Sequence, residues 1–145
     1  MKKIYLLSSL LLAAVITLSG CKSQKDSEDA DAAVPSKPAS TSILEKISAE
    51  DAKTMMDGSQ DITILDVRTQ EEYDLGHIAG AVLIPVDDIA DKAEQILTDK
   101  SETILVYCRS GRRSALAAQT LSDLGFTAVY DFGGIIDWPY EVVTE

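Results

Sequence analysis

Short apolar runs alternate with one-sided apolar segments from about residue 48 to the end of the chain. Runs that are rich in β-branched residues and too short for helices predict buried strands at 62–67, 81–84, 103–107 and 126–130. Capping residues followed by helix-like segments predict helices at 48–56, 69–75, 87–97 and 114–124. Strands that alternate with helices indicate an α/β domain with a parallel or mostly parallel sheet covered on both faces.

Three further expectations concern the ends of these elements. Asp87 or Asp88 is expected to cap the third helix, whose apolar positions on one face are Ile89, Ala93, Ile96 and Leu97. Gly125 is expected to end the fourth helix. After the last strand, residues 133–138 predict a short closing helical turn.

The first twenty residues have the pattern of an export signal. Lys2 and Lys3 precede an apolar stretch at 6–18 that is too short for a comfortable membrane span. The stretch ends in Leu18-Ser19-Gly20-Cys21, which resembles the bacterial lipobox, in which the cysteine receives diacylglycerol and becomes the new N-terminus. We therefore expect a lipoprotein signal peptide at 1–20 and lipidation of Cys21. The alternatives are a plain secretory signal and an uncleaved anchor.

Residues 21–42 have no sustained apolar period and predict a flexible tether from the lipidated cysteine to a domain at 43–145. The expected location is outside the cytoplasm, with the N-terminal lipid in a bacterial cell membrane. Lys22 is not the aspartate expected of inner-membrane retention, which favours outer-membrane sorting if such a membrane exists.

The chain is strongly acidic, with a formal net charge of −11, and loss of Lys2 and Lys3 would make it more negative. Nucleic acids and anionic lipid headgroups would be repelled by such a chain, so they are not expected partners. A basic cluster on an acidic protein indicates a focused anion site.

That cluster follows Cys108, which stands between a predicted strand and a predicted helix. A thiol at such a turn faces unpaired backbone N–H groups and the positive end of the helix. Such positions lower a thiol pKa from about 8.5 to roughly 3.5–7.5, which favours a nucleophilic thiolate. We expect the following residues to bind an anionic substrate: Arg109, Ser110, Gly111, Arg112, Arg113 and Ser114.

The alternative interpretation of Cys108 is a small hydrophobic residue at the end of a buried strand. Three arginines within five residues weaken it, because they repel one another unless an anion lies among them. Gly111 suits a backbone that turns with positive φ. If Cys21 is lipidated, Cys108 is the remaining thiol, no disulfide can form, and the domain depends on its core.

These residues resemble the single-domain rhodaneses, or thiosulfate sulfurtransferases. The resemblance spans 43–145 and rests on Asp66-Val67-Arg68 with Glu72-Tyr73 and residues 76–81, on the loop 107–114, and on Gly133-Gly134 with Trp138. It implies a three-layer domain with a mostly parallel five-stranded sheet. It also implies that Cys108 takes a sulfane sulfur from thiosulfate or a related anionic donor, forms a persulfide, and passes the sulfur to cyanide or a thiol. It implies neither a cofactor nor a metal.

Roles can be suggested for the surrounding residues. Arg109 and Arg112 are expected to orient the departing sulfite, since a guanidinium suits oxyanions. Ser114 is expected to cap the helix or donate to the sulfur, while Arg113 points either inward or outward. Asp66 and Arg68 are expected to brace the loop by pairing with backbone groups or with each other. Further along the chain, we expect His77 to be structural and Trp138 to pack the C-terminal turn onto the core.

Two other functions use similar residues. A cysteine-based phosphatase or arsenate reductase separates its Cys and Arg by five residues, whereas four lie between Cys108 and Arg113, and the tighter ring suits a single sulfur atom. A non-catalytic module that carries or senses sulfur, or binds a partner, would share the first half-reaction. We expect the protein to be a monomer.

Overall fold

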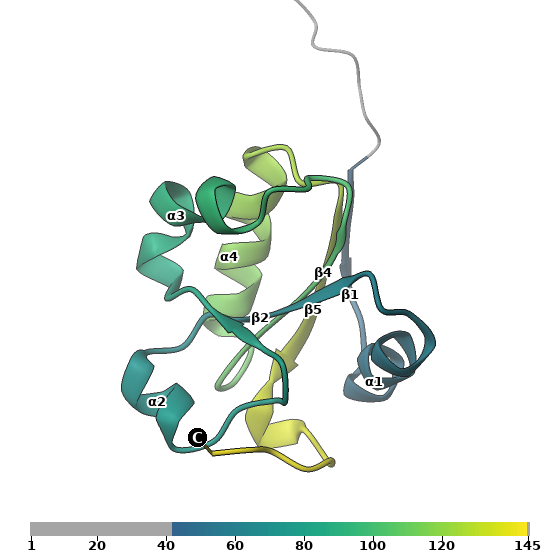
Figure 1. The fold of residues 1–145 in the computed structure, drawn as a ribbon, viewed down its shortest axis with the longest axis vertical. Coiled ribbons are helices and arrows are strands. Elements are labelled where there is room, and N and C mark those ends of the chain that lie inside the picture. Colours follow the sequence, from purple (N-terminus) through teal and green to yellow (C-terminus); the bar gives the residue numbers. More distant parts are fainter. Residues whose placement is uncertain (1–41, 145) are drawn as a thin grey trace, which may run out of the picture. The chain divides into compact units, whose positions relative to one another are not determined.

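A five-stranded parallel sheet forms the centre of residues 42–144, the part of the chain that this computed structural model describes (Figure 1). Its order is β1-β5-β4-β2-β3, and every neighbouring pair is parallel. The strands are β1 (Ile43–Lys46), β2 (Ile62–Asp66), β3 (Val82–Leu83), β4 (Thr103–Cys108) and β5 (Ala128–Gly134). The α/β fold expected from the sequence is confirmed. Cys21, the predicted signal peptide and all but the last residue of the predicted tether lie outside the described residues.

Helices cover both faces of the sheet (Figure 1). On one face lies α1 (Ala49–Gly58), and on the other lie α3 (Ile89–Ile96) and α4 (Arg112–Asp123). A short helix, α2 (Gln70–Asp74), follows β2, and two 3₁₀ turns, η1 (Val86–Asp88) and η2 (Ile135–Asp137), complete the domain. The three layers place the turns that follow β2 and β4 at one edge of the sheet, where their carboxyl ends meet.

Alternation along β4 divides the core into two parts. Ile104 and Val106 pack toward α3 and α4, whereas Leu105 and Tyr107 pack toward α1, and all four are at most 1% exposed. This period of two is the pattern of a strand buried on both faces. Each such side chain stabilises the fold by roughly 1.5–3 kcal/mol through burial. The rigid strand ends at Cys108.

The sheet differs from the sequence prediction at both ends of the domain. The strand β1 was not predicted, because all four of its residues are exposed at the edge of the sheet and therefore lack the apolar pattern of a buried strand. The prediction that β5 ends at 130 is wrong, since it continues to Gly134, and the closing helical turn is limited to η2. Two consecutive glycines hid the end of this strand, because glycine is rare inside strands.

Helix boundaries also differ in detail. Ile96 is 47% exposed because α3 ends there and the chain turns Leu97 inward. Asp88 stands at the N-cap but its side chain makes no capping bond, and it accepts from Lys92 Nζ at 2.9 Å instead. Gly125 has a φ of +91° and follows the end of α4, as predicted.

Candidate active site

Cys108 is the last residue of the central strand and is only 1% exposed. It pairs with Gly134 of β5, after an irregularity in the pairing between Val106 and Cys108. Because β4 has a strand on either side, the cysteine backbone is fixed by the sheet. The sulfur therefore has a defined position at the start of the loop.

The backbone of the loop turns toward the sulfur. Gly111 is the N-cap of α4 in the left-handed region, with φ +97°, and its N–H donates to Cys108 Sγ at 3.1 Å. Burial opposes ionisation of the thiol, but the N–H groups of Ser114, Ser110 and Gly111 outweigh it, so the pKa of Cys108 lies below its ordinary value. The arrangement favours a thiolate and offers several donors to an anion beside it.

Ser114 lies inside the first turn of α4 and is fully buried. Its hydroxyl oxygen is 3.0 Å from the carbonyl oxygen of Gly111 and 3.3 Å from that of Gly133. The hydroxyl also contributes to the lowered pKa of Cys108. Of the two roles considered for Ser114, the helix cap is wrong, because Gly111 holds that position and the sequence alone does not fix the first helical residue.

The three arginines of the loop have different surroundings. Arg109 and Arg112 are exposed, so both can meet an incoming anion, and Arg109 lines a groove beside the loop. Arg113 does not point out into solvent. Its two terminal nitrogens donate to the carboxylate of Glu72 at 2.6 and 2.8 Å, and Glu72 raises the pKa of Arg113, with a smaller contribution from Cys108. A bidentate pair of this kind fixes a guanidinium in one plane.

Glu72 belongs to the motif that carries the resemblance, but the sequence assigned it no role in the site. It belongs to a capping box at the start of α2, in which its side chain accepts from Thr69 N at 3.1 Å and Thr69 Oγ1 accepts from Glu72 N at 3.3 Å. The bond to Arg113 lowers the pKa of Glu72 to about 2. The Thr-x-x-Glu spacing signals the capping box, but no sequence signal pairs Glu72 with a residue in another element.

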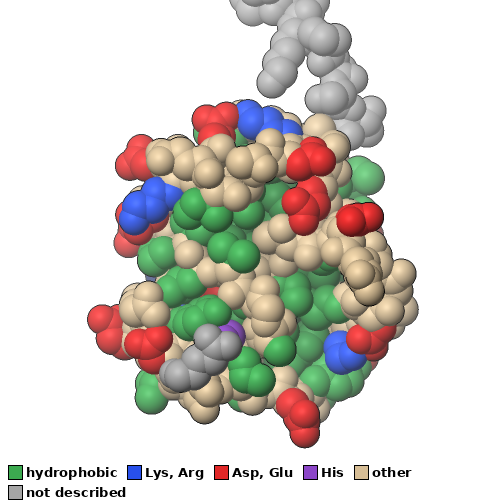
Figure 2. Space-filling view, viewed as in Figure 1, with side chains coloured by type: hydrophobic (Ala, Val, Ile, Leu, Met, Phe, Trp, Pro, Cys, Tyr) green, Lys and Arg blue, Asp and Glu red, His purple; other side chains and the backbone are tan. Residues whose placement is uncertain are grey.

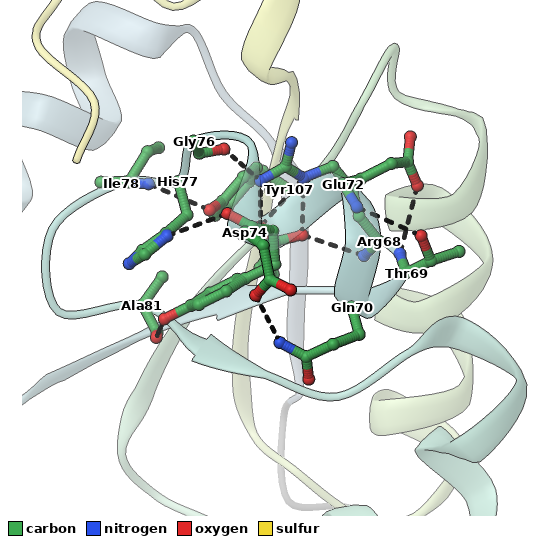
Figure 3. Close-up of polar contacts among 12 residues, drawn as sticks. Arg68, Thr69, Gln70, Glu72, Asp74, Gly76, His77, Ile78, Ala81 and Tyr107 are labelled. Carbon is green, nitrogen blue, oxygen red and sulfur yellow. Dashed lines mark hydrogen bonds and ion pairs between the residues drawn. The ribbon is translucent and has the colours of Figure 1, made fainter. Parts of the chain in front are cut away.

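Asp66 and Arg68 form a buried ion pair at the end of β2. Arg68 donates to both carboxylate oxygens of Asp66, at 2.6 to 3.0 Å, and to the carbonyl oxygen of Gly76 at 2.7 Å. The Arg68 guanidinium also lies 5.6 Å from the centre of the Tyr107 ring. Figure 3 shows Arg68 between Glu72, Gly76 and Tyr107. These contacts join the end of β2 to the turn at Gly76, and they do not reach Cys108 directly.

A second feature that the sequence did not reveal is the close approach of β5 to the loop. A Cβ atom at Gly134 would lie 2.5 Å from the carbonyl oxygen of Arg109 and 2.7 Å from Cα of Ser110. No side chain fits there, because real Cβ contacts do not fall below 3.0 Å. Gly134 therefore allows the loop to rest on β5, which is a reason for glycine that only the fold shows.

The remaining candidates are structural. His77 is 2% exposed, stacks on Tyr73 with 3.6 Å between ring centroids, and exchanges backbone hydrogen bonds with Val143. Trp138 is 8% exposed and its ring centroid lies 5.6 Å from that of Phe132. Neither side chain lies among the groups that act on the Cys108 pKa.

Residues 42–144 hold no cluster of His, Cys, Asp and Glu side chains suited to a metal ion. In the same range, every helix is too short or too polar to cross a bilayer.

Curated relatives match the domain in sequence. The chain is 38% identical to the thiosulfate sulfurtransferase PspE of Escherichia coli, over 50% of this chain and 70% of that protein. It is also 38% identical to the putative sulfur carrier protein YrkF of Bacillus subtilis, over 67% of this chain and 52% of that protein. The chain thus spans about half the length of the Bacillus relative.

Solved structures share the fold. A rhodanese-related protein from Thermoplasma volcanium has a TM-score of 0.61 at 34% identity, covering 70% of this chain and 99% of that one. A rhodanese from E. coli, solved with anions, has a TM-score of 0.55 at 34% identity, covering 58% of this chain and 99% of that one. The profile of the rhodanese-like domain matches residues 48–139. The chain therefore belongs to the rhodanese-like domain family.

Proposed function

We propose that this protein is a sulfurtransferase that moves a sulfane sulfur from thiosulfate, or a related anionic donor, to a thiol or cyanide. The observation that carries the proposal is the sulfur of Cys108, which is held 3.1 Å from the N–H of Gly111 and has a lowered pKa. A thiolate in this position attacks the outer sulfur of thiosulfate, and sulfite leaves with the electron pair of the broken bond. The backbone N–H groups then face the outer sulfur of the persulfide.

The surrounding residues suit this reaction in separate ways. Arg109 and Arg112 are exposed at the loop, where they can bind the donor and then release sulfite. Arg113 adds positive potential near the sulfur while Glu72 fixes its position. The residues of the loop proposed to hold the donor are therefore Arg109, Ser110, Gly111, Arg112, Arg113 and Ser114.

Two measurements test the proposal. After incubation with thiosulfate, mass spectrometry should find one additional sulfur on the peptide that contains Cys108. Addition of cyanide should then give thiocyanate with steady-state turnover. Hydrolysis of p-nitrophenyl phosphate without any reaction of thiosulfate would instead favour a phosphatase.

A sulfur carrier without turnover is the second candidate. It is favoured by the name of the Bacillus relative, a putative sulfur carrier protein, which is 38% identical. A carrier would acquire the sulfur on Cys108 and hold it until a partner removes it. Stable loading of Cys108 in the absence of turnover with either cyanide or small thiols would distinguish this function from that of the enzyme.

We also propose that the chain is exported and held at a bacterial membrane by a lipid on Cys21, with the domain acting as a monomer. The support is the lipobox-like sequence at 18–21 after an apolar stretch. A bacterial cell that expresses the chain should incorporate labelled fatty acid into it, and Cys21→Ala should abolish the label. A soluble, unlabelled wild-type chain would contradict the anchor.

A further inference from the structure

We propose that a cavity beside α1 binds a small organic cation, an amine whose ammonium group is attached to an apolar body. The cavity has a volume of about 690 Å³, within the range of ligand sites. It is lined by residues of α1 and β2, of the segment between α2 and β3, and of the C-terminal segment at 138–141. The loop after β4 contributes none of the lining residues, so this site is separate from that of Cys108.

The cavity exists because one face of the sheet is covered less completely than the other (Figure 1). On the face covered by α3 and α4, Leu65 of β2 is fully buried. On the opposite face, α1 leaves Ile64 of the same strand only half-buried, although other strands pair with β2 on both sides. Ile64, Met56 and Ile78 therefore offer an apolar lining to the body of a ligand.

The charged residues that line this cavity are Lys53 and Asp57 of α1 and Glu141 of the C-terminal segment. Two carboxylates and one ammonium leave an excess of negative charge, in a chain whose net charge is −11. Figure 2 shows apolar side chains at the surface beside the position that α1 occupies in Figure 1, with charged side chains of both signs at their border. An apolar cavity with this excess favours a cation over an anion.

Lys53 shows how an ammonium group is held at this cavity. Its Nζ donates to Asp57 Oδ2 at 2.6 Å and lies 5.6 Å from the centre of the Tyr140 ring. A carboxylate and an aromatic ring are groups that attract ammonium ions. Tyr140 is 39% exposed, so its ring is also open to a ligand. Trp138 lines the cavity too, but its Nε1 is buried, so this N–H is not offered to a ligand.

Glu141 supplies the carboxylate for the ligand. It is exposed, and its carboxylate forms no ion pair or hydrogen bond within residues 42–144. The ammonium of Lys53 binds Asp57 instead. We therefore expect the ligand to place its ammonium near Glu141 and Tyr140 and its apolar body against Ile64.

Fluorescence of Trp138 tests this inference, because Trp138 lines the cavity and is the only tryptophan of the chain. The full chain is titrated with three probes that share one apolar body: phenylbutylamine, phenylbutanol and phenylbutyrate. We expect saturable binding of the amine with a Kd about fivefold below that of the alcohol, which one exposed carboxylate and one aromatic ring can supply. The carboxylate probe should bind most weakly.

Matched variants locate the effect of charge. Glu141→Gln should remove most of the preference for the amine over the alcohol. Lys53→Met removes a competing ammonium and leaves Asp57 to the ligand, so it should raise that preference by about twofold or more. Asp91→Asn changes an exposed carboxylate of α3 outside the cavity, so this control should leave the preference unchanged. Thermal unfolding reports that each variant is folded.

The possible outcomes decide this inference independently of the sulfur reaction. Equal binding of the amine and the alcohol, or tighter binding of the carboxylate probe, would show that the cavity is not a cation site. An unchanged fluorescence with all three probes, or an unchanged preference in Glu141→Gln, would contradict the inference as well. Binding of a lysine-containing peptide without binding of the free amine would assign the cavity to a protein partner instead.

Discussion

The two ends of the sheet both carry polar surroundings and an open cavity, yet only one end is suited to bind anions. At the carboxyl end, the loop after β4 directs N–H groups toward Cys108, and α4 begins there. At the amino end, where β2 and β4 begin, a cavity of about 580 Å³ is lined by Ser59, Asp61, Asp99, Ser101 and neighbouring residues. This cavity is larger than the groove of about 410 Å³ that Arg109 lines beside the catalytic loop, yet the candidate active site lies at the carboxyl end.

The direction of the backbone explains the difference. At the amino end, α4 ends and presents carbonyl oxygens, one of which, that of Leu124, accepts from Lys100 Nζ at 2.7 Å. The carboxylates at this amino end accept hydrogen bonds from residues beside them. Asp99 accepts from Ser101 N at 2.8 Å, and Glu102 accepts from Thr63 Oγ1 at 2.7 Å. Acceptors gather at one end of a parallel α/β domain and donors at the other. This polarity, more than cavity size, indicates where an anion binds.

The largest expected effect comes from removing the nucleophile at the carboxyl end. Cys108→Ser should abolish the sulfur adduct and lower thiosulfate–cyanide turnover by about 10³-fold or more, since an alcohol cannot form the persulfide. Steady-state thiocyanate formation measures this. Ser101→Ala at the opposite end is the control and should retain turnover within about twofold. Unchanged turnover in Cys108→Ser would remove the sulfurtransferase assignment.

A methyl group between β5 and the loop should have the next largest effect. Gly134→Ala places Cβ at 2.5 Å from the carbonyl oxygen of Arg109, so the loop must shift. We expect a loss of about 1–3 kcal/mol in the free energy of unfolding and about 10²-fold in turnover from misplacement of the loop.

Denaturant unfolding and thiocyanate formation measure both effects of Gly134→Ala. Gly58→Ala is the matched control, because nothing lies within 4 Å of its Cβ position at the end of α1. Equal turnover in the two variants would show that close contact with β5 does not hold the loop.

The ion pair between Glu72 and Arg113 should give a smaller effect that depends on pH. The pKa of Glu72 is lowered from 4.5 to about 2, so its stabilisation is complete above about 4.5 and is lost as the pH falls through about 2. Glu72→Gln should therefore lower the free energy of unfolding by about 1 kcal/mol at neutral pH. In this variant the free energy of unfolding should also fall less steeply as the pH is lowered toward 2.

Urea unfolding at several pH values measures the contribution of Glu72. Asp57→Asn removes the exposed pair with Lys53 and should cost less than about 0.5 kcal/mol. If Glu72→Gln and the wild-type chain lose stability in parallel between these pH values, Glu72 is not the group responsible.

The smallest expected effect concerns salt. The lowered pKa of Cys108 arises from fixed backbone N–H groups close to a buried sulfur, which ions screen weakly. The midpoint of its alkylation by iodoacetamide should lie below the ordinary thiol pKa and change by less than about 0.3 pH units between about 0.05 and about 0.5 M salt. A large upward change of this midpoint at high salt would instead assign the lowered pKa of Cys108 to the exposed Arg109 and Arg112.

Several features followed from the sequence because they depend on local pattern. The strands around 62–67 and 103–107 have short runs rich in β-branched residues, and Ser48, Thr69 and Gly125 have the chemistry of helix ends. The position of Cys108 between a strand and a helix followed from the same pattern. Together these features indicated the α/β fold and the candidate nucleophile.

Other features required contacts between residues that are distant in the chain. The edge strand β1 has four exposed residues and is recognised only by its pairing with β5. Glu72 and Arg113 are 41 residues apart, and the approach of Gly134 to Arg109 depends on how β5 passes the loop. No local pattern encodes such neighbours.

The sequence by itself therefore determined the alternation of strands and helices, the acidic balance of the chain and the thiol at a helix start, because each is a property of consecutive residues. Tertiary structure decided the direction of Arg113, the glycine required at 134 and the apolar groove beside the loop. The physical reason is that bidentate pairing, close backbone approach and a shared surface exist only after separate elements have packed together.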